Sequence, residues 1–303
     1  MNSELNDDSG SLEAKLQRFR ALTISHPLLD SATRELTHFI MESPANGLLL
    51  FVGPTGSGKT TAALQIHREF NEKGNAQKDN KGAPPLLYGA VAASETDEPN
   101  WLQFYQEFLR EAKTTTQGLR GLNEHRDMYE QMLQSRSVLG VFIDEAQHLF
   151  ETADGRSGMD AFEVLQSLAD RSKTRHVLFS TEQLLGRAHM NARFGRRVHY
   201  LHLPRCKADR NFVHVIRTLQ NYLPLPPERD LLEEFQFVYD RSLGCVGLLK
   251  AWLYKASVAA ARNRESGISM ELLDRTALSP AIRKRMLEEI VNGERLWEAL
   301  TRR

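Results

Sequence analysis

The stretch GLLLFVGPTGSGKTT, residues 47–61, constrains the fold more than any other part of the chain. Its five apolar residues, Leu48 to Val52, predict a buried strand, and the apolar spacing over residues 61–70 predicts a helix. Between them, residues 53–60 fit the pattern G-x-x-x-x-G-K-[ST], in which glycines let several backbone N–H groups converge on one anion. The stretch therefore predicts a strand, a phosphate-binding loop and a helix, which together begin a parallel α/β fold.

This glycine-rich loop predicts a site for ATP with Mg²⁺. In the pattern, Lys59 reaches the β- and γ-phosphates and the Thr60 hydroxyl binds Mg²⁺. The helix that follows directs the positive end of its dipole at the same phosphates. The candidate nucleotide-binding residues are Gly53, Pro54, Thr55, Gly56, Ser57, Gly58, Lys59, Thr60 and Thr61.

A second apolar run ends abruptly in two acids. Five of the six residues 138–143 are large and apolar, and Asp144 and Glu145 follow at once. A buried parallel strand whose carboxyl end lies at a ligand crevice has this pattern. We expect Asp144 to hold Mg²⁺ with Thr60, and Glu145 to orient and deprotonate an attacking water. Because phosphoryl transfer to a metabolite does not need such an acid here, the pair favours ATP hydrolysis.

A third apolar run, residues 176–181, ends in Ser180 and Thr181. A polar side chain at the tip of this strand is placed to sense the γ-phosphate, and Thr181 is the preferred candidate. The alternative is that these residues cap a helix that begins near Glu182.

Three arginines lie within residues 193–197. In an oligomeric ATPase, an arginine supplied to the γ-phosphate of the neighbouring subunit lies near this position, so Arg193 and Arg196 are candidate fingers. A solvated basic turn or a DNA-facing patch is the alternative.

Strands that alternate with helices predict a three-layer α/β/α sandwich with a parallel sheet, followed by a small all-α lid. We expect a flexible N-terminus over residues 1–18, a core over 19–225, a lid over 226–278, and a C-terminal helix or tail over 279–303 that could dock a partner. The predicted boundary is the proline-rich run at residues 223–227.

Composition excludes few functions. Thirty-nine basic and thirty-nine acidic residues cancel, so DNA binding requires that basic residues gather on one face. Two cysteines do not make a disulfide scaffold or a cysteine metal site. With no long apolar run and a polar, acidic beginning, we expect no membrane segment and a cytoplasmic protein.

These motifs together resemble those of an AAA+ ATPase, and within that class the TnsC/TniB transposition regulators. The resemblance covers about residues 20–265. Besides the glycine-rich loop and the two acids, it rests on shorter and less specific motifs. The motifs are GPTGSGKT at 53–60, IDEA at 143–146, STEQL at 180–184, the pair Arg193-Phe194, and GCVGLL at 244–249.

The resemblance implies a protein that binds ATP, assembles as a ring or helical filament on duplex DNA, and disassembles as ATP is hydrolysed. It also implies a transposase and a TniQ-type target selector as partners. Family members contact DNA phosphates through Thr and Lys side chains on loops after the second strand, without reading bases. The corresponding candidates are Lys113, Thr114, Thr115, Thr116 and Arg120, and the alternative is a solvated loop between two helices.

This chain departs from the family pattern at the turn of the lid. Many AAA+ lids place an arginine on the nucleotide where this chain has Gly247, and Lys250 is the nearest basic residue. A signalling or scaffold ATPase without a DNA role is one alternative function. A replication initiator or helicase loader is another, although residues 264–303 are too short for a C-terminal winged helix.

Overall fold

The computed structural model describes residues 10–76, 85–94, 99–150, 157–190 and 197–301. Contacts divide the chain into two compact units. The α/β unit comprises Leu29–Gly53, Lys59–Leu203 and Asn292–Arg303. The helical unit comprises Met1–Leu28, Pro54–Gly58 and Pro204–Val291.

The α/β unit is built on a parallel sheet in the order β2-β3-β4-β1-β5. Its strands are β1 (Leu48–Val52), β2 (Leu86–Ala90), β3 (Gly140–Asp144), β4 (Arg175–Ser180) and β5 (Val198–His202). Every residue of β1 and β3 is buried, as expected for parallel strands that are covered on both faces. The sheet places the ends of β1, β4 and β3 side by side at one edge.

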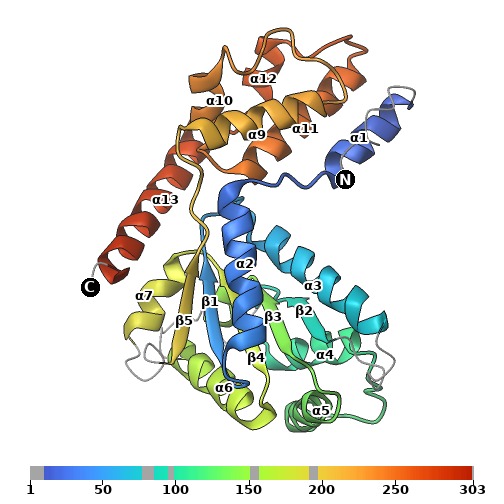
Figure 1. The fold of residues 1–303 in the computed structure, drawn as a ribbon, viewed down its shortest axis with the longest axis vertical. Coiled ribbons are helices and arrows are strands. Elements are labelled where there is room, and N and C mark those ends of the chain that lie inside the picture. The colour runs from blue at the N-terminus through green and yellow to red at the C-terminus, as the bar shows by residue number, and fades with distance from the viewer. Residues whose placement is uncertain (1–9, 77–84, 95–98, 151–156, 191–196, 302–303) are drawn as a thin grey trace. The chain divides into compact units, whose positions relative to one another are not determined.

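Helices cover both faces of this sheet (Figure 1). On one face, the alternate β1 residues Leu48, Leu50 and Val52 share a core cluster with apolar side chains of α4 to α7. On the other face lie α2 and α3, and Ile40 of α2 lies over Gly140 of β3. These helices are α2 (Pro27–Glu42), α3 (Lys59–Ala76), α4 (Trp101–Glu111), α5 (Leu122–Ser135), α6 (Ser157–Ser172) and α7 (Gln183–Met190). The predicted α/β/α sandwich with a parallel sheet is confirmed.

The helical unit has its own core. Its helices are α1 (Leu12–Ala21), α9 (Arg210–Asn221), α10 (Phe235–Ser242), α11 (Val246–Arg262), α12 (Met270–Thr276) and the first part of α13 (Pro280–Thr301). Phe212 and Ile216 of α9 are fully buried with Leu249 and Leu253 of α11. Because α9 buries its apolar face in this core, the chain divides at Pro204 and not at the proline-rich run 223–227.

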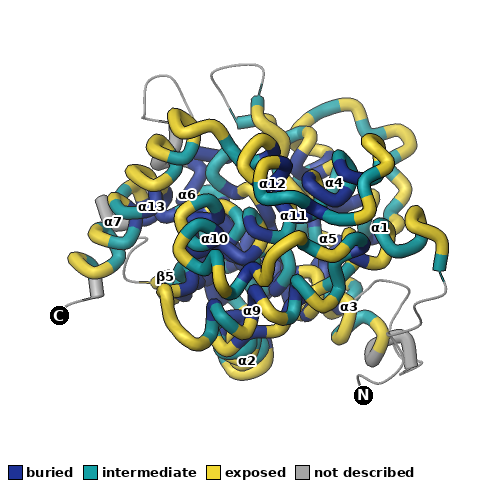
Figure 2. Tube along the Cα trace, turned by 90° about the horizontal axis from the view of Figure 1, so that it is seen from above, coloured by how far each residue is buried: buried dark blue, intermediate teal, exposed yellow. Residues whose placement is uncertain are grey.

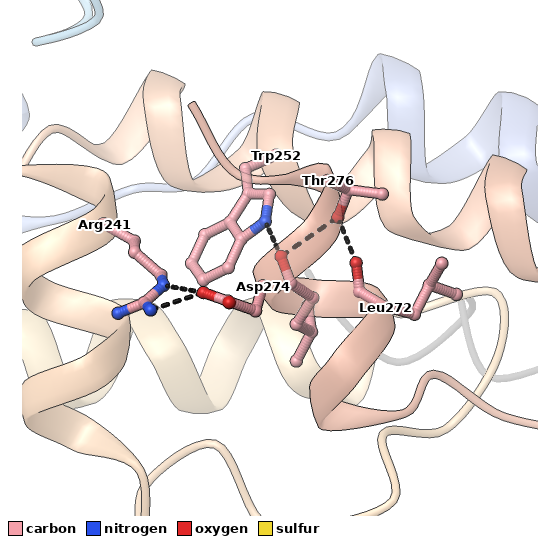
Figure 3. A network of polar contacts seen from close by, with 6 residues as sticks. Arg241, Trp252, Leu272, Asp274 and Thr276 are labelled. Atoms are coloured by element: carbon pink, nitrogen blue, oxygen red, sulfur yellow. Dashed lines mark hydrogen bonds and ion pairs between the residues drawn. The ribbon is translucent and has the colours of Figure 1, made fainter. Parts of the chain in front are cut away.

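Polar contacts bind α12 to α10 and α11 (Figure 3). The Trp252 indole N–H donates to the Leu273 carbonyl at 2.9 Å, and Thr276 Oγ1 donates to the same oxygen at 3.2 Å. The Arg241 guanidinium pairs with Asp274. Trp252 and Thr276 thus satisfy a carbonyl near the end of a seven-residue helix that is too short to be stable alone.

We expected a flexible N-terminus over residues 1–18, of which residues 1–9 lie outside the described part of the chain. Residues 12–21 form α1, which Ser11 caps by accepting the Ala14 N–H. Phe19 is buried in the helical core. Lys250 Nζ donates to the Arg20 and Leu22 carbonyls at 2.7 and 2.5 Å, so its ammonium group stabilises the C-terminal end of α1.

The last part of α13 belongs to the α/β unit, where it packs against a buried polar pair. His202 Nε2 lies 3.2 Å from Glu182 Oε1, and both side chains are at most 9% exposed. The Trp297 ring stacks on His202 with a centroid separation of 4.7 Å. Gly293 lies directly over Glu182. The beginning of the same helix is mostly exposed (Figure 2).

Among the described residues, no single helix is long and apolar enough to cross a membrane. The bent pair α10 and α11 meets the length and composition criteria jointly, with an angle of 107° between its members.

We predict that Gly293→Ala destabilises the protein. Alanine normally stabilises a helix interior relative to glycine by about 1 kcal/mol. Here the new Cβ would lie 2.8 Å from Cβ of the buried Glu182, so we expect a loss of about 1–3 kcal/mol in urea unfolding. Gly186→Ala is the control, because its Cβ would meet only Leu296 Cδ2 at 3.7 Å. Equal stability of the two variants would contradict the prediction.

We also predict that Lys250→Met loosens α1. The change leaves the Arg20 and Leu22 carbonyls without their charged donor, a contact of about 1.5–3 kcal/mol. Amide hydrogen exchange over residues 12–21 should therefore accelerate by about tenfold or more. Lys255→Met, an exposed lysine on the same helix, should leave exchange in α1 unchanged. Protection of α1 that survives Lys250→Met would refute the assigned contact.

Candidate nucleotide-binding site

A buried carboxylate lies at the centre of the candidate site. Asp144, the last residue of β3, is 4% exposed and accepts three hydrogen bonds. Thr60 Oγ1 donates to its Oδ2 at 2.7 Å, Tyr88 Oη to the same oxygen at 2.8 Å, and the Glu145 N–H to Oδ1 at 2.9 Å. Burial and the nearby Asp144 raise the pKa of Tyr88 above its usual range, so the phenol remains a proton donor.

The pair formed by Thr60 and Asp144 fits a magnesium ion. Both supply oxygen atoms, which Mg²⁺ prefers. An octahedral ion with bonds of about 2.1 Å places neighbouring ligand oxygens about 3 Å apart, close to the 2.7 Å between Thr60 Oγ1 and Asp144 Oδ2. Because Thr60 donates its proton to Asp144, its oxygen lone pairs remain available to a cation. In the described part of the chain, no three His, Cys, Asp or Glu residues gather as a metal site.

Glu145 begins the short 3-10 helix η1 (Ala146–Leu149) in the left-handed region, with φ 52° and ψ 36°. A non-glycine residue in this region is uncommon, and such strain often occurs at functional sites. The Glu145 side chain is exposed, and its carboxylate accepts a hydrogen bond from Gln147 Nε2. The side-chain amide oxygen of Gln147, Oε1, in turn accepts from Ser180 Oγ at 3.1 Å.

The base of the glycine-rich loop is held by the sheet. The Gly53 N–H donates to the Ser180 carbonyl at 3.3 Å, and Lys59 Nζ donates to the Gly53 carbonyl at 2.7 Å. These contacts hold the Lys59 side chain near the end of β1. Lys59 is the first residue of α3, and Thr60 is the second. Thr61 is the next residue of that helix and is half-buried.

The apex of the loop, Pro54–Gly58, is part of the helical unit as the contacts divide the chain. Gly56 and Gly58 have φ values of +79° and +115°, which only glycine adopts without strain. The Ser57 N–H donates to the Pro54 carbonyl at 3.1 Å. Ser57 Oγ is buried and has no hydrogen-bond partner among the described residues, so a polar ligand could satisfy it.

Close contacts within the helical unit explain why both positions 244 and 247 of the predicted lid turn hold glycine. The Gly247 N–H donates to the Gly56 carbonyl at 2.8 Å, and a Cβ on Gly247 would lie 2.9 Å from that oxygen. Gly244 has φ +74°, and a Cβ there would lie 2.4 Å from the Cys206 carbonyl oxygen. Gly247 therefore leaves no room for the arginine that many AAA+ lids carry, and Lys250 is engaged with α1.

Of the remaining predicted catalytic residues, the structure describes Thr181 but not the two candidate arginine fingers. Thr181 follows β4, and its carbonyl accepts the Leu184 N–H at the start of α7. Arg193 and Arg196 lie outside the described residues. Arg197, the third arginine of that cluster, is exposed and lies 3.6 Å from Asp170.

The candidate DNA-contacting residues lie on the loop between α4 and α5. Lys113 follows α4 in the left-handed conformation with φ 51°, and the Thr114 N–H donates to the Leu109 carbonyl. Lys113, Thr115 and Arg120 are exposed, and Thr116 is half-buried. The Thr114 hydroxyl oxygen is buried, so this side chain does not face solvent as a phosphate contact would require.

Tyr88 and Gln147 also belong to this candidate site, although the sequence motifs do not include them. Tyr88 is the one hydroxyl in the apolar run Leu86–Val91, and Gln147 is a polar residue two positions after Glu145. These were the only signals in the chain. Their contacts with Asp144, Glu145 and Ser180 depend on strand order and on η1.

Comparisons with known proteins agree on the fold. A family model described as "AAA domain" matches residues 44–187. No curated protein sequence matches the chain. Among solved structures, the ORC2 protein of Aeropyrum pernix is similar with TM-score 0.58 and 16% identity, over 87% of this chain and 72% of that chain.

Two further structures extend the comparison. Drosophila ORC bound to DNA has TM-score 0.54 and 14% identity, over 93% of this chain and 69% of that chain. Domain III of the Thermotoga maritima replication initiation protein DnaA has TM-score 0.51 and 15% identity, over 85% and 94%. Residues 44–187 thus match the AAA domain family, and the chain has the AAA+ fold.

Proposed function

We propose that this protein is a Mg²⁺-dependent ATPase whose ATP-bound form assembles on duplex DNA. The observation that carries the ATPase proposal is the hydrogen bond from Thr60 to Asp144, with Glu145 next in the chain. It joins the end of the glycine-rich loop to the end of β3. A phosphate chain and an activated water must meet at such a place.

Each residue of the site has a distinct task in this proposal. ATP supplies the phosphoanhydride bond to be cleaved, and Mg²⁺ neutralises the charge on its phosphates. The loop amides and Lys59 bind the phosphates, while Thr60 and Asp144 hold the cation. Glu145 accepts the proton of the attacking water and orients it toward the γ-phosphate. Tyr88 donates to Asp144 and keeps that carboxylate oriented.

Two elements of the proposal concern assembly. Thr181 senses the γ-phosphate from the tip of β4, and Arg193 or Arg196 completes the site of a neighbouring subunit as an arginine finger. A site completed in this way couples ATP occupancy to a homo-oligomer, either a ring or a helical filament. ATP then holds the subunits together, and hydrolysis releases them.

The DNA contact is proposed at the exposed loop residues Lys113, Thr115 and Arg120. The Arg120 N–H donates to Glu124 at 2.6 Å, which fixes the backbone and leaves the guanidinium exposed. Such side chains contact phosphates without reading bases. Since the chain has no net charge, affinity comes from repeating this loop along an oligomer.

For the biological process we propose DNA transposition, with a transposase and a TniQ-type selector as partners. The support is the set of motifs that resemble TnsC/TniB regulators, in particular IDEA at 143–146 and GCVGLL at 244–249. Replication initiation is the second candidate, favoured by the structural likeness to ORC2 and DnaA. Negative-stain microscopy with duplex DNA and a non-hydrolysable ATP analogue tests the shared premise, because a signalling ATPase would form no DNA-dependent rings or filaments.

Variants of the ATPase residues should separate binding from hydrolysis. Lys59→Ala should abolish ATP binding, measured by titration with a fluorescent analogue, because it removes the charge that faces the phosphates. Glu145→Gln should bind ATP with normal affinity but hydrolyse it at least about a hundredfold more slowly, as expected for a lost general base. Chelation of Mg²⁺ should stop hydrolysis by the wild type. Normal turnover by Glu145→Gln would remove Glu145 from this role.

Variants of the loop after α4 should weaken DNA binding equally for all sequences. Lys113→Ala with Thr115→Ala removes one phosphate contact or more, so the slope of log affinity against log salt should fall by about 1 for each contact. Lys173→Ala is a matched control, because Lys173 is also an exposed, left-handed lysine that follows a helix, with φ 53° against 51° for Lys113. An unchanged salt slope in the double variant would exclude this loop as the contact.

A further inference from the structure

Glu145 is held by a side chain that the proposed mechanism does not use. Its carboxylate accepts a hydrogen bond from Gln147 Nε2 across a single intervening residue, Ala146. The left-handed backbone of Glu145 brings the two side chains together at the start of η1. The contact is therefore built into the local backbone and does not depend on a long, flexible reach.

Chemistry fixes the orientation of the Gln147 amide. A carboxylate only accepts hydrogen bonds, so the amide NH₂ group must face Glu145. The amide oxygen then faces Ser180, whose hydroxyl donates to it at 3.1 Å. With both ends of the amide engaged, Gln147 cannot rotate without losing two hydrogen bonds.

Ser180 connects this contact to the glycine-rich loop. It is the last residue of β4, is 1% exposed, and pairs in register with Val52 of β1. Its carbonyl accepts the N–H of Gly53, whose own carbonyl accepts from Lys59 Nζ. A continuous path of hydrogen bonds thus runs from Lys59 through Gly53, Ser180 and Gln147 to Glu145.

We propose that Gln147 is a positioning residue that, fixed by Ser180, orients the Glu145 carboxylate toward the attacking water. The proposal rests on the proposed hydrolytic role of Glu145. Gln147 itself does not touch the phosphates; it acts through Glu145. Removing it should therefore slow the chemical step and leave nucleotide binding intact.

The test compares Gln147→Leu and Ser180→Ala with wild type. We expect kcat to fall by about tenfold to a hundredfold, less than the full contribution of a general base. Affinity for ADP should stay within about twofold, whereas affinity for ADP with aluminium fluoride, which mimics the transition state, should fall in parallel with kcat. Ser180→Thr, which keeps the hydroxyl, should retain more activity than Ser180→Ala. Gln134→Leu is the control, because the Gln134 amide donates to the Arg171 carbonyl, which is not part of this site.

A double-variant cycle separates this inference from the proposed function. If Gln147 acts through Glu145, adding Gln147→Leu to Glu145→Gln should cause no further loss of kcat. Normal turnover by both Gln147→Leu and Ser180→Ala would overturn the inference while Glu145→Gln remains slow. A parallel loss of ADP affinity, or an additive loss in the double variant, would also overturn it. Normal turnover by Glu145→Gln would instead reject the proposed function.

Discussion

The hydrogen bond between Thr60 and Asp144 is the interaction on which the site depends. It joins residues that are 84 positions apart, one in the first turn of α3 and the other at the end of β3. A bond to a buried carboxylate contributes about 1.5–3 kcal/mol, and it is lost if β3 shifts its register in the sheet or if α3 begins elsewhere. Strand order brings the two together, because β4 alone separates β1 from β3.

Close backbone contacts set a second constraint, and they explain the glycines of both motifs. Gly56 and Gly58 turn the loop with positive φ values, and Gly244 does the same between α10 and α11. Gly247 has no such backbone need; it is small because the Gly56 carbonyl lies against it. That position 247 holds glycine and not arginine is thus a consequence of packing within the helical unit. Lys250, the nearest alternative, stabilises α1 instead.

Local patterns predicted much of the α/β unit. Apolar runs identified the parallel strands, and the acids after residue 143 were placed at the correct end of β3. The division of the chain was not predictable, because prolines at 223–227 mark a turn whereas α9 belongs to the helical core before it. Whether residues 12–18 form a helix also depends on distant groups, namely the helical core around Phe19 and the ammonium of Lys250.

By itself, the sequence determined which residues are the candidates for binding phosphate, because the glycines, Lys59 and Thr60 lie in one short segment and their geometry is local. It also determined that two acids follow a buried strand. Only the tertiary structure decided which side chains surround those acids. Tyr88, Gln147 and Ser180 lie on three different segments, and they converge because a parallel sheet brings its strand ends to one edge. Spacing along the sequence does not predict this convergence, because hydrogen bonds between segments depend on strand order and register.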